Sequence, residues 1–263
     1  METPDTAPRA AKTFEDVTLS ESEGVRYLHF GTEWVQGAMR IAHPFRLELE
    51  YQQQMMAPLL FAPRPVRVLQ LGLGAGALTK FCHRHLPESQ IVAVDISPMV
   101  IRVARQWFTL PSDDERLRVV QADAGAFVQG IAASADYLQV DLYDAQARGP
   151  VLDDVRFYKA CRAALRGGGI GAFNLFGRSL AASLAGMSAA FGSRWLRLPR
   201  TAAGNTVVLA FAGVPLHWES DALVRRAKTL ERRFGWAAPV WLKGLRASSG
   251  RRLRLAAGSG FTL

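Results

Sequence analysis

The chain has 263 residues, of which 49% are hydrophobic and 21% are charged. This composition excludes an intrinsically disordered chain, and two cysteines are too few for a disulfide-stabilised miniprotein. The formal charge of +9 is concentrated: residues 223–263 carry ten basic side chains and one acid, Glu231, whereas the first 222 residues balance to zero. A uniformly cationic surface for nucleic acid is therefore not indicated, but a basic C-terminal segment is.

The first predicted unit, residues 13–62, is a small N-terminal β-region with a linker helix. Polar and apolar side chains alternate around Val25–Phe30 with glycines between the runs, which predicts short antiparallel strands. The pattern over Glu48–Leu60 predicts a helix, which Pro58 is expected to kink or end.

The second predicted unit, residues 63–214, alternates short apolar runs with helical patterns, which is typical of a parallel sheet with crossover helices. We therefore predict an α/β fold with a doubly wound, mostly parallel sheet of the methyltransferase-like Rossmann type. A helix is expected over Asp154–Arg166, with Gly167 as a left-handed stop. The expected strands are Val66–Leu71, Ile91–Asp95, Leu117–Gln121, Tyr137–Asp141, Ile170–Leu175 and Val207–Phe211.

The third predicted unit, residues 215–263, begins with a basic amphipathic helix over Asp221–Phe234 and continues as a Ser- and Gly-rich tail. Trp218, Trp236 and Trp241 are expected to pack this helix onto the rest of the protein.

Several other features predict the protein's surroundings. The polar N-terminal residues lack an apolar segment after them, and Asn174 and Arg178 interrupt the longest weakly polar stretch, so neither a signal peptide nor a membrane-spanning helix is expected. Cys82 and Cys161 are expected to be reduced core thiols in a cytoplasmic protein. His83 and His85 flank Arg84 in a predicted helix without the set of acids and cysteines that a metal site requires, so we expect solvated surface and no metal site.

The candidate chemistry lies after the strands, because ligands bind outside the carboxyl ends of the strands in an open parallel sheet. Gly72, Gly74 and Gly76 follow the first of these strands and open a helix, which lets the backbone approach a nucleoside or phosphate closely. Asp95 ends the next strand at a spacing suited to ribose hydroxyls. Ser97 is the better helix cap there, so Asp95 is expected to be free for a ligand.

Asp123 and Ala124 follow the third strand of this unit. The Asp123 carboxylate could accept a hydrogen bond from an exocyclic adenine amine, or it could cap the helix that follows. The sequence leaves both readings open.

Two carboxylates, Asp141 and Asp144, follow the fourth strand three residues apart. Like charges so close together repel, and burial raises their pKa. A solvated turn is one explanation of the pair. Helix capping is not, because Asp153 or Asp154 directly precedes the next helix. A cationic substrate would satisfy both acids, and a desolvated carboxylate can accept the proton of an amine.

Taken together, these motifs resemble the spermidine synthase family of polyamine aminopropyltransferases. The similarity spans roughly residues 20 to 212, with an apparent insertion between Gln36 and Tyr51. The elements that carry it are Gly72-Leu73-Gly74-Ala75-Gly76, Val94-Asp95-Ile96, Ala122-Asp123, Asp141-x-x-Asp144, Trp34-Val35-Gln36-Gly37 and Glu50-Tyr51-Gln52.

The resemblance implies transfer of an aminopropyl group from decarboxylated S-adenosylmethionine, a co-substrate, to an amine such as putrescine, giving spermidine and methylthioadenosine. It implies that Asp141 accepts the amine's proton and that Asp144 holds a substrate ammonium, with Gln36, Tyr51 and Gln52 also on the amine side. It further implies a homodimer. The residues implied on the nucleoside side are Gly72, Gly74, Gly76, Asp95, Asp123 and Ala124.

The chain departs from the family on the amine side. Ala75 stands where the glycine loop usually has an acid, Gln52 and Gln53 replace a His and a Glu, and Ala145 replaces a Pro. Two alternatives therefore stay open: a methyltransferase that uses S-adenosylmethionine itself, and a non-catalytic nucleoside-binding protein with a basic nucleic-acid-binding tail. Nucleic acid is the less expected partner.

Overall fold

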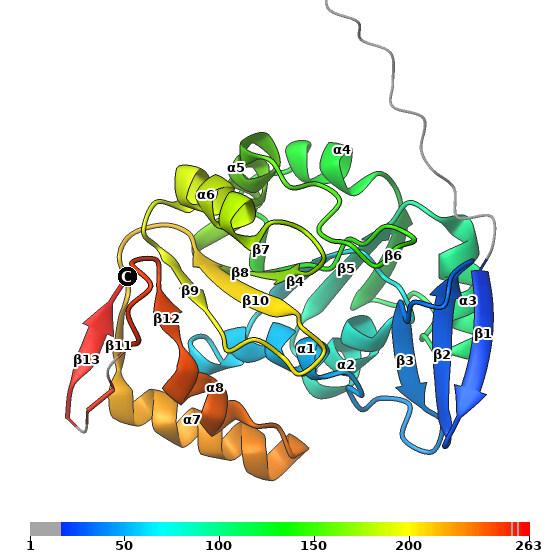
Figure 1. Cartoon of the computed structure of the whole chain (residues 1–263), viewed down its shortest axis with the longest axis horizontal. Coiled ribbons are helices and arrows are strands. Elements are labelled where there is room, and N and C mark those ends of the chain that lie inside the picture. The colour runs from blue at the N-terminus through cyan, green and yellow to red at the C-terminus, as the bar shows by residue number, and fades with distance from the viewer. Residues whose placement is uncertain (1–16, 254, 257) are drawn as a thin grey trace, which may run out of the picture.

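The computed structural model describes residues 17–253, 255–256 and 258–263, and its first element is a small antiparallel sheet (Figure 1). This sheet consists of β1 (Val17–Ser22), β2 (Val25–Phe30) and β3 (Gly37–Arg40) in that order. The predicted short antiparallel strands are confirmed. Val25 and Leu28 are the buried side chains of β2.

The main body is an eight-stranded sheet with the order β12-β9-β10-β8-β7-β4-β5-β6. The strands β6, β5, β4, β7 and β8 run parallel to one another, whereas β10, β9 and β12 each pair antiparallel with their neighbours. The predicted methyltransferase-like α/β fold with a mostly parallel sheet is confirmed. The strand bounds are β4 (Arg67–Leu71), β5 (Gln90–Asp95), β6 (Leu117–Gln121), β7 (Ala135–Val140), β8 (Leu165–Leu175), β9 (Trp195–Arg197), β10 (Thr206–Phe211) and β12 (Arg246–Ala247).

Helices cover both faces of this sheet (Figure 1). One apolar core lies under α4, α5 and α6, and a second core includes buried side chains of α1, α2, α7 and α8. The helix bounds are α1 (Glu50–Met55), α2 (Ala77–His85), α3 (Pro98–Trp107), α4 (Ala124–Gln129), α5 (Val155–Ala164), α6 (Leu180–Phe191), α7 (Ser220–Phe234) and α8 (Ala238–Gly244).

Two predicted helix ends need correction. The helix expected over Glu48–Leu60 is two elements, α1 and a 3₁₀ turn η1 (Ala57–Leu60), with Pro58 in the first positions of the turn, where its missing N–H costs nothing. Gly167 is not a left-handed stop: α5 ends at Ala164, and Leu165 already has extended backbone and begins β8. The predicted cap of α5 is confirmed at Asp154, which accepts from the Phe157 N–H at 2.8 Å.

The basic C-terminal segment is built into the main body. The predicted packing of Trp218, Trp236 and Trp241 is confirmed, since all three are buried in one core cluster, and β12 extends the main sheet. The segment also forms a two-stranded sheet from β11 (His217–Glu219) and β13 (Gly260–Thr262).

The two cysteines and the two helical histidines have structural partners. Cys82 and Cys161 are free thiols with no exposed surface, as expected, and burial raises the pKa of Cys82 to about 12. The expectation of solvated histidines is wrong: His83 pairs with Asp114 at 2.8 Å, and the His85 ring lies 4.6 Å from the Phe81 ring. Within the described part of the chain, no helix combines the length and apolar character that crossing a membrane requires.

Candidate active site

The residues predicted to carry the chemistry meet at one edge of the sheet. Leu71 of β4 is paired with Val94 of β5 and with Val140 of β7, and all three strands run in the same direction. The segments that follow them therefore emerge side by side, which places the glycine loop between Asp95 and Asp141.

The glycine loop needs glycine for two physical reasons. Gly72, Gly74 and Gly76 all have positive φ, at +96°, +51° and +65°, a region that L side chains rarely adopt. A Cβ at Gly72 would also lie 2.2 Å from the carbonyl oxygen of Asp141. The loop thus brings the β4 backbone against the backbone of Asp141, and Gly76 directly precedes α2.

Asp95 is not free of protein partners, contrary to the prediction. Its carboxylate accepts from the Leu73 N–H at 3.0 Å and from the Ser97 N–H at 2.9 Å. Burial raises its pKa, and these backbone donors lower it in part. A carboxylate has about four acceptor positions, so the held Asp95 still has capacity for hydroxyl donors beside the glycine loop.

Of the two predicted roles of Asp123, helix capping is confirmed for one of its carboxylate oxygens. Its Oδ1 accepts from the Ala126 N–H at 2.7 Å and caps α4. The Ala124 side chain is buried, whereas Asp123 is exposed at the same edge of the sheet. Capping is therefore one established role of this residue, and the adenine contact stays a prediction.

Asp141 is the carboxylate with the most specialised surroundings. Its Oδ1 accepts from Asn174 Nδ2 at 3.0 Å, and the Tyr51 hydroxyl donates to the same carboxylate. Burial raises the pKa of Asp141, the two hydrogen bonds offset part of this rise, and the resulting pKa is about 6. The group is thus a stronger base than an ordinary aspartate but is still ionised at neutral pH.

A chain of contacts fixes the position of Tyr51. The buried Gln52 donates through its Nε2 to the Tyr51 hydroxyl oxygen at 3.5 Å. Helix α1, which carries both residues, is tied to β7 because Gln139 Nε2 donates to the Met55 carbonyl at 3.0 Å. Strand β7, which directly precedes Asp141, therefore also positions α1, the helix that carries the Tyr51 hydroxyl group.

Three polar residues of the site were not predicted from the sequence. Asn174 holds Asp141, and Asn205 Nδ2 donates to Asn174 Oδ1 at 3.1 Å and to the Tyr143 hydroxyl at 3.4 Å. Asn174 is fully buried at the end of β8. An asparagine that interrupts an apolar strand was the one available signal, since buried amides are retained where they have partners.

Asp144 is already neutralised by its own loop. Its carboxylate pairs with the Arg148 guanidinium at 3.0 Å and accepts from the backbone N–H of Gln146 and of Arg148 at 3.0 and 2.9 Å. The Arg148 side chain is 54% exposed, whereas Asp144 is 22% exposed. The Arg148 guanidinium is therefore paired with the carboxylate that the family resemblance assigns to a substrate ammonium.

The N-terminal sheet closes over this loop. Gln36 Nε2 donates to the Asp144 carbonyl at 3.0 Å, and Thr32 Oγ1 donates to the Ala145 carbonyl at 2.9 Å. The Gln36 side chain therefore lies beside the site and is bonded to the backbone of the Asp144 loop, not to the Asp144 carboxylate.

Ala75 and Gln53, which stand where the family has acids, both contact other parts of the protein. Ala75 is buried and its Cβ would lie 2.6 Å from a Cβ at Gly37, so the glycine loop touches β3 at this point. Gln53 donates to the Leu47 carbonyl at 3.0 Å.

The described residues contain no cluster of three or more His, Cys, Asp or Glu side chains that could hold a metal ion.

The architecture and the carboxylates at one sheet edge define an α/β protein of the methyltransferase-like class. Residues 48–174 match the family model described as the spermine/spermidine synthase domain. A polyamine aminopropyltransferase of Neisseria meningitidis is 34% identical over 245 residues, which covers 92% of this chain and 93% of that protein. The chain therefore belongs to the spermine/spermidine synthase family of aminopropyltransferases.

Two solved structures are similar to the whole chain or most of it. A probable spermidine synthase from Corynebacterium glutamicum has a TM-score of 0.68 at 20% identity, covering 92% of this chain and 94% of that one. Human Methyltransferase-like protein 13 in complex with SAH has a TM-score of 0.62 at 27% identity, covering 70% of this chain and 91% of that one. The same fold thus carries proteins named for two kinds of transfer.

Proposed function

We propose that this protein transfers an aminopropyl group from decarboxylated S-adenosylmethionine to an amine such as putrescine, releasing methylthioadenosine and, with putrescine, spermidine. The observation that supports this most is Asp141: a carboxylate of raised pKa, beside the glycine loop, oriented by two donors from α1 and β8. Asp95 and the glycine loop would hold the nucleoside, with Asp123 and Ala124 at its base.

The proposed reaction is a single displacement. The nitrogen lone pair of the amine attacks the aminopropyl carbon bonded to the sulfonium, the new C–N bond forms, and the C–S bond breaks. Its electron pair stays on sulfur, which leaves as the neutral thioether of methylthioadenosine. A free alkylamine is protonated at neutral pH, so Asp141 accepts the proton that the nitrogen must lose. In-line positioning supplies much of the remaining rate.

The direct test is release of methylthioadenosine from decarboxylated S-adenosylmethionine, measured by chromatography over a panel of mono- and diamines. A known spermidine synthase assayed in parallel is the positive control. Release with at least one amine is the expected result. No release with any amine, when the control is active, contradicts the proposed function.

The Tyr51 hydroxyl gives a pH-dependent prediction. Because ionised Asp141 is the proton acceptor, kcat at saturating amine is expected to fall as the pH drops through about 6, the pKa of this carboxyl. Tyr51 donates to the carboxylate and lowers its pKa, so Tyr51→Phe is expected to move the acidic limb of the profile to higher pH. Stopped assays from pH 5 to pH 9 measure the shift; a limb that stays in place would show that the hydroxyl does not tune Asp141.

Arg148 gives a prediction about the acceptor. A diamine that places its far ammonium on Asp144 must displace the Arg148 guanidinium. An exposed ion pair is worth about 0.2–1 kcal/mol, so Arg148→Gln is expected to lower the KM for putrescine by about two- to fivefold. The KM for a monoamine such as propylamine should not change, because it has no second charge.

Arg166→Gln is a matched control, since Arg166 is also an exposed arginine paired with an aspartate, Asp136, at 3.4 Å. Its KM for putrescine should equal that of the wild type. An unchanged KM in Arg148→Gln as well would show that Asp144 does not receive the substrate's far ammonium.

Methyl transfer from S-adenosylmethionine is the second candidate function. It is supported by the similarity to human Methyltransferase-like protein 13 and by the pairing of Asp144 with Arg148, which weakens the case for a cationic acceptor. Calorimetric titration with both nucleosides separates the two candidates. Tighter binding of the decarboxylated form supports aminopropyl transfer, and tighter binding of S-adenosylmethionine supports methyl transfer.

The alternative of a non-catalytic protein with a nucleic-acid-binding tail is tested by substitution of basic residues, because the C-terminal segment cannot be removed without harm to the fold. Truncation at Ser220 would delete Leu223, Trp236 and Trp241 from the core and would disturb the whole fold. Substitution of exposed basic residues of α7, such as Arg225 and Lys228, by Gln leaves that core intact. Salt-sensitive DNA or RNA binding that this change removes would favour the alternative.

A further inference from the structure

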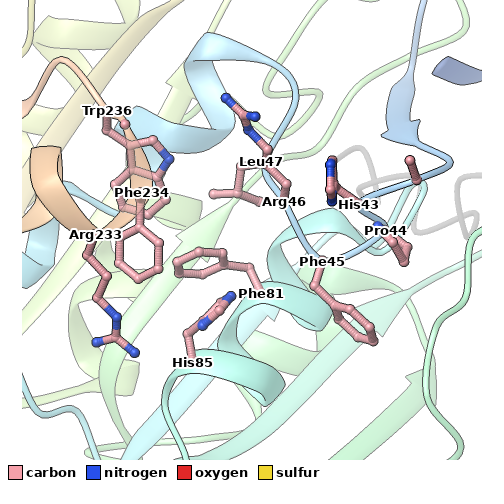
Figure 2. Close-up of a pocket in the computed structure, with 12 residues that line it drawn as sticks. His43, Pro44, Phe45, Arg46, Leu47, Phe81, His85, Arg233, Phe234 and Trp236 are labelled. Atoms are coloured by element: carbon pink, nitrogen blue, oxygen red, sulfur yellow. The ribbon is translucent and has the colours of Figure 1, made fainter. Parts of the chain in front are cut away.

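A pocket outside the proposed active site is formed by three segments that lie far apart in the sequence (Figure 2). They are the loop at residues 42–47, the C-terminal end of α2, and the end of α7 with the residues after it. The volume is about 570 Å³, within the range of small-molecule sites. The first segment lies within the apparent insertion relative to the family, and the last lies within the basic C-terminal segment.

The pocket is lined largely by aromatic side chains. Phe81 lies at its centre, with Phe234 and Trp236 on one side and His43, Pro44 and Phe45 on the other (Figure 2). Phe81 and Trp236 are buried, whereas Phe45 and Phe234 are half-buried. Phe234 stacks on Trp236 with ring centroids 4.6 Å apart. Aromatic faces with some remaining exposure suit a planar ring that can stack on them or meet them edge-on.

The charge of the pocket has one sign. Its charged lining residues are Arg46 and Arg233, His43 and His85 also line it, and none of the described residues that line it is an acid. The Arg233 guanidinium lies over the Phe234 ring, 4.8 Å from its centroid. Burial lowers the pKa of His85, and the charges of Arg233 and Arg84 lower it further. The positive potential here is therefore uncompensated, which favours an anionic group.

We propose that this pocket binds a small planar aromatic anion, with the ring against the half-buried Phe234 and the anionic group near Arg233. The site is separate from the proposed nucleoside site. Helix α2 runs from Gly76 at the glycine loop to His85 in the pocket, and its nine residues span about 13 Å. The proposal does not depend on which group the enzyme transfers.

The test uses 2-naphthoate as the probe, titrated calorimetrically into the full-length protein with saturating methylthioadenosine present to fill the nucleoside site. Saturable one-to-one binding is expected. The neutral isostere 2-naphthamide is expected to bind about three- to fivefold more weakly, because it lacks the charge that an exposed arginine can pair with. Cyclohexanecarboxylate, which keeps the charge but lacks the planar ring, should also bind more weakly.

A pair of neighbouring arginines on α7 locates the site. Arg233→Gln is expected to weaken binding of 2-naphthoate by about three- to fivefold. Arg232→Gln removes the same charge from an exposed side chain that does not line the pocket and should leave binding unchanged. No saturable binding, equal binding of the amide, or equal losses in the two variants would each overturn the proposal.

Discussion

Replacement of Asp141 by Asn is expected to lower kcat for methylthioadenosine release by about 10²- to 10⁴-fold, the usual contribution of a positioned general base. The amide has nearly the same shape but cannot accept the amine's proton. Its oxygen can still accept from Asn174, so the site should keep its geometry. Calorimetry should therefore show methylthioadenosine binding within about twofold of the wild type.

The control for this variant is Asp154→Asn, which removes a carboxylate that caps α5 but keeps the cap, because Asn caps helices as well as Asp does. Its kcat should be close to that of the wild type. An Asp141→Asn variant with more than about a tenth of the wild-type kcat would contradict the assignment of Asp141 as proton acceptor.

The same substitution is expected to stabilise the folded protein at neutral pH. The pKa of Asp141 rises from 3.8 to about 6 on folding, so the folded state binds more protons than the unfolded state between these values. The wild type therefore loses stability as the pH rises through this window, and its ionised carboxylate costs about 1–3 kcal/mol above it. Urea unfolding should show Asp141→Asn to be more stable at pH 7.5, with a smaller gain at pH 5.

The parallel part of the fold was predictable because each strand there carries its own signal. The apolar runs that form β4 to β7 are local, and the glycine or aspartate after each run marks the edge where it ends. The α2 and α3 starts are equally local, since Ser97 accepts from the Val100 N–H at 3.2 Å to cap α3 as the sequence suggested.

The remaining part of the fold depends on distant partners. β9, β11 and β12 have only two or three residues each and exist because they pair with segments far along the chain, as β11 does with β13. No periodicity can be read over so few residues. The prediction that Gly167 ends α5 was wrong for a related reason, because the pairing of β8 with β7 begins at Leu165, before the glycine.

The candidate site divides in the same way. Asp95, Asp123 and Asp141 were found because each lies at the end of a strand or within two residues after it. Asn174 lies near the end of β8 and Asn205 directly precedes β10, and the hydrogen bonds that link them to each other and to Asp141 join residues 31 or more positions apart. The pairing of Asp144 with Arg148 is local, but only the loop conformation brings the guanidinium back to the carboxylate.

Gly72→Ala is expected to disrupt both stability and activity. The backbone at φ +96° disfavours any Cβ, and the new methyl group would lie 2.2 Å from the Asp141 carbonyl oxygen. Both strands are fixed at this point, since the Gly72 N–H donates to Val94 and the Asp141 N–H donates to Leu71. The overlap adds to the cost of the dihedral, so we expect a loss of about 3 kcal/mol or more in the free energy of unfolding.

Gly24→Ala separates the two costs. Gly24 has φ +74° in the turn between β1 and β2, and a Cβ there would meet nothing within 4 Å. It should lose only about 1 kcal/mol, the cost of the dihedral, and keep its activity. Gly72→Ala should in addition lower kcat/KM by about 10²-fold or more, since a displaced Asp141 backbone moves the proton acceptor. Equal urea midpoints for the two variants would mean that Asp141 yields to the methyl group, and the close approach of β4 and β7 would then not be what requires glycine at position 72.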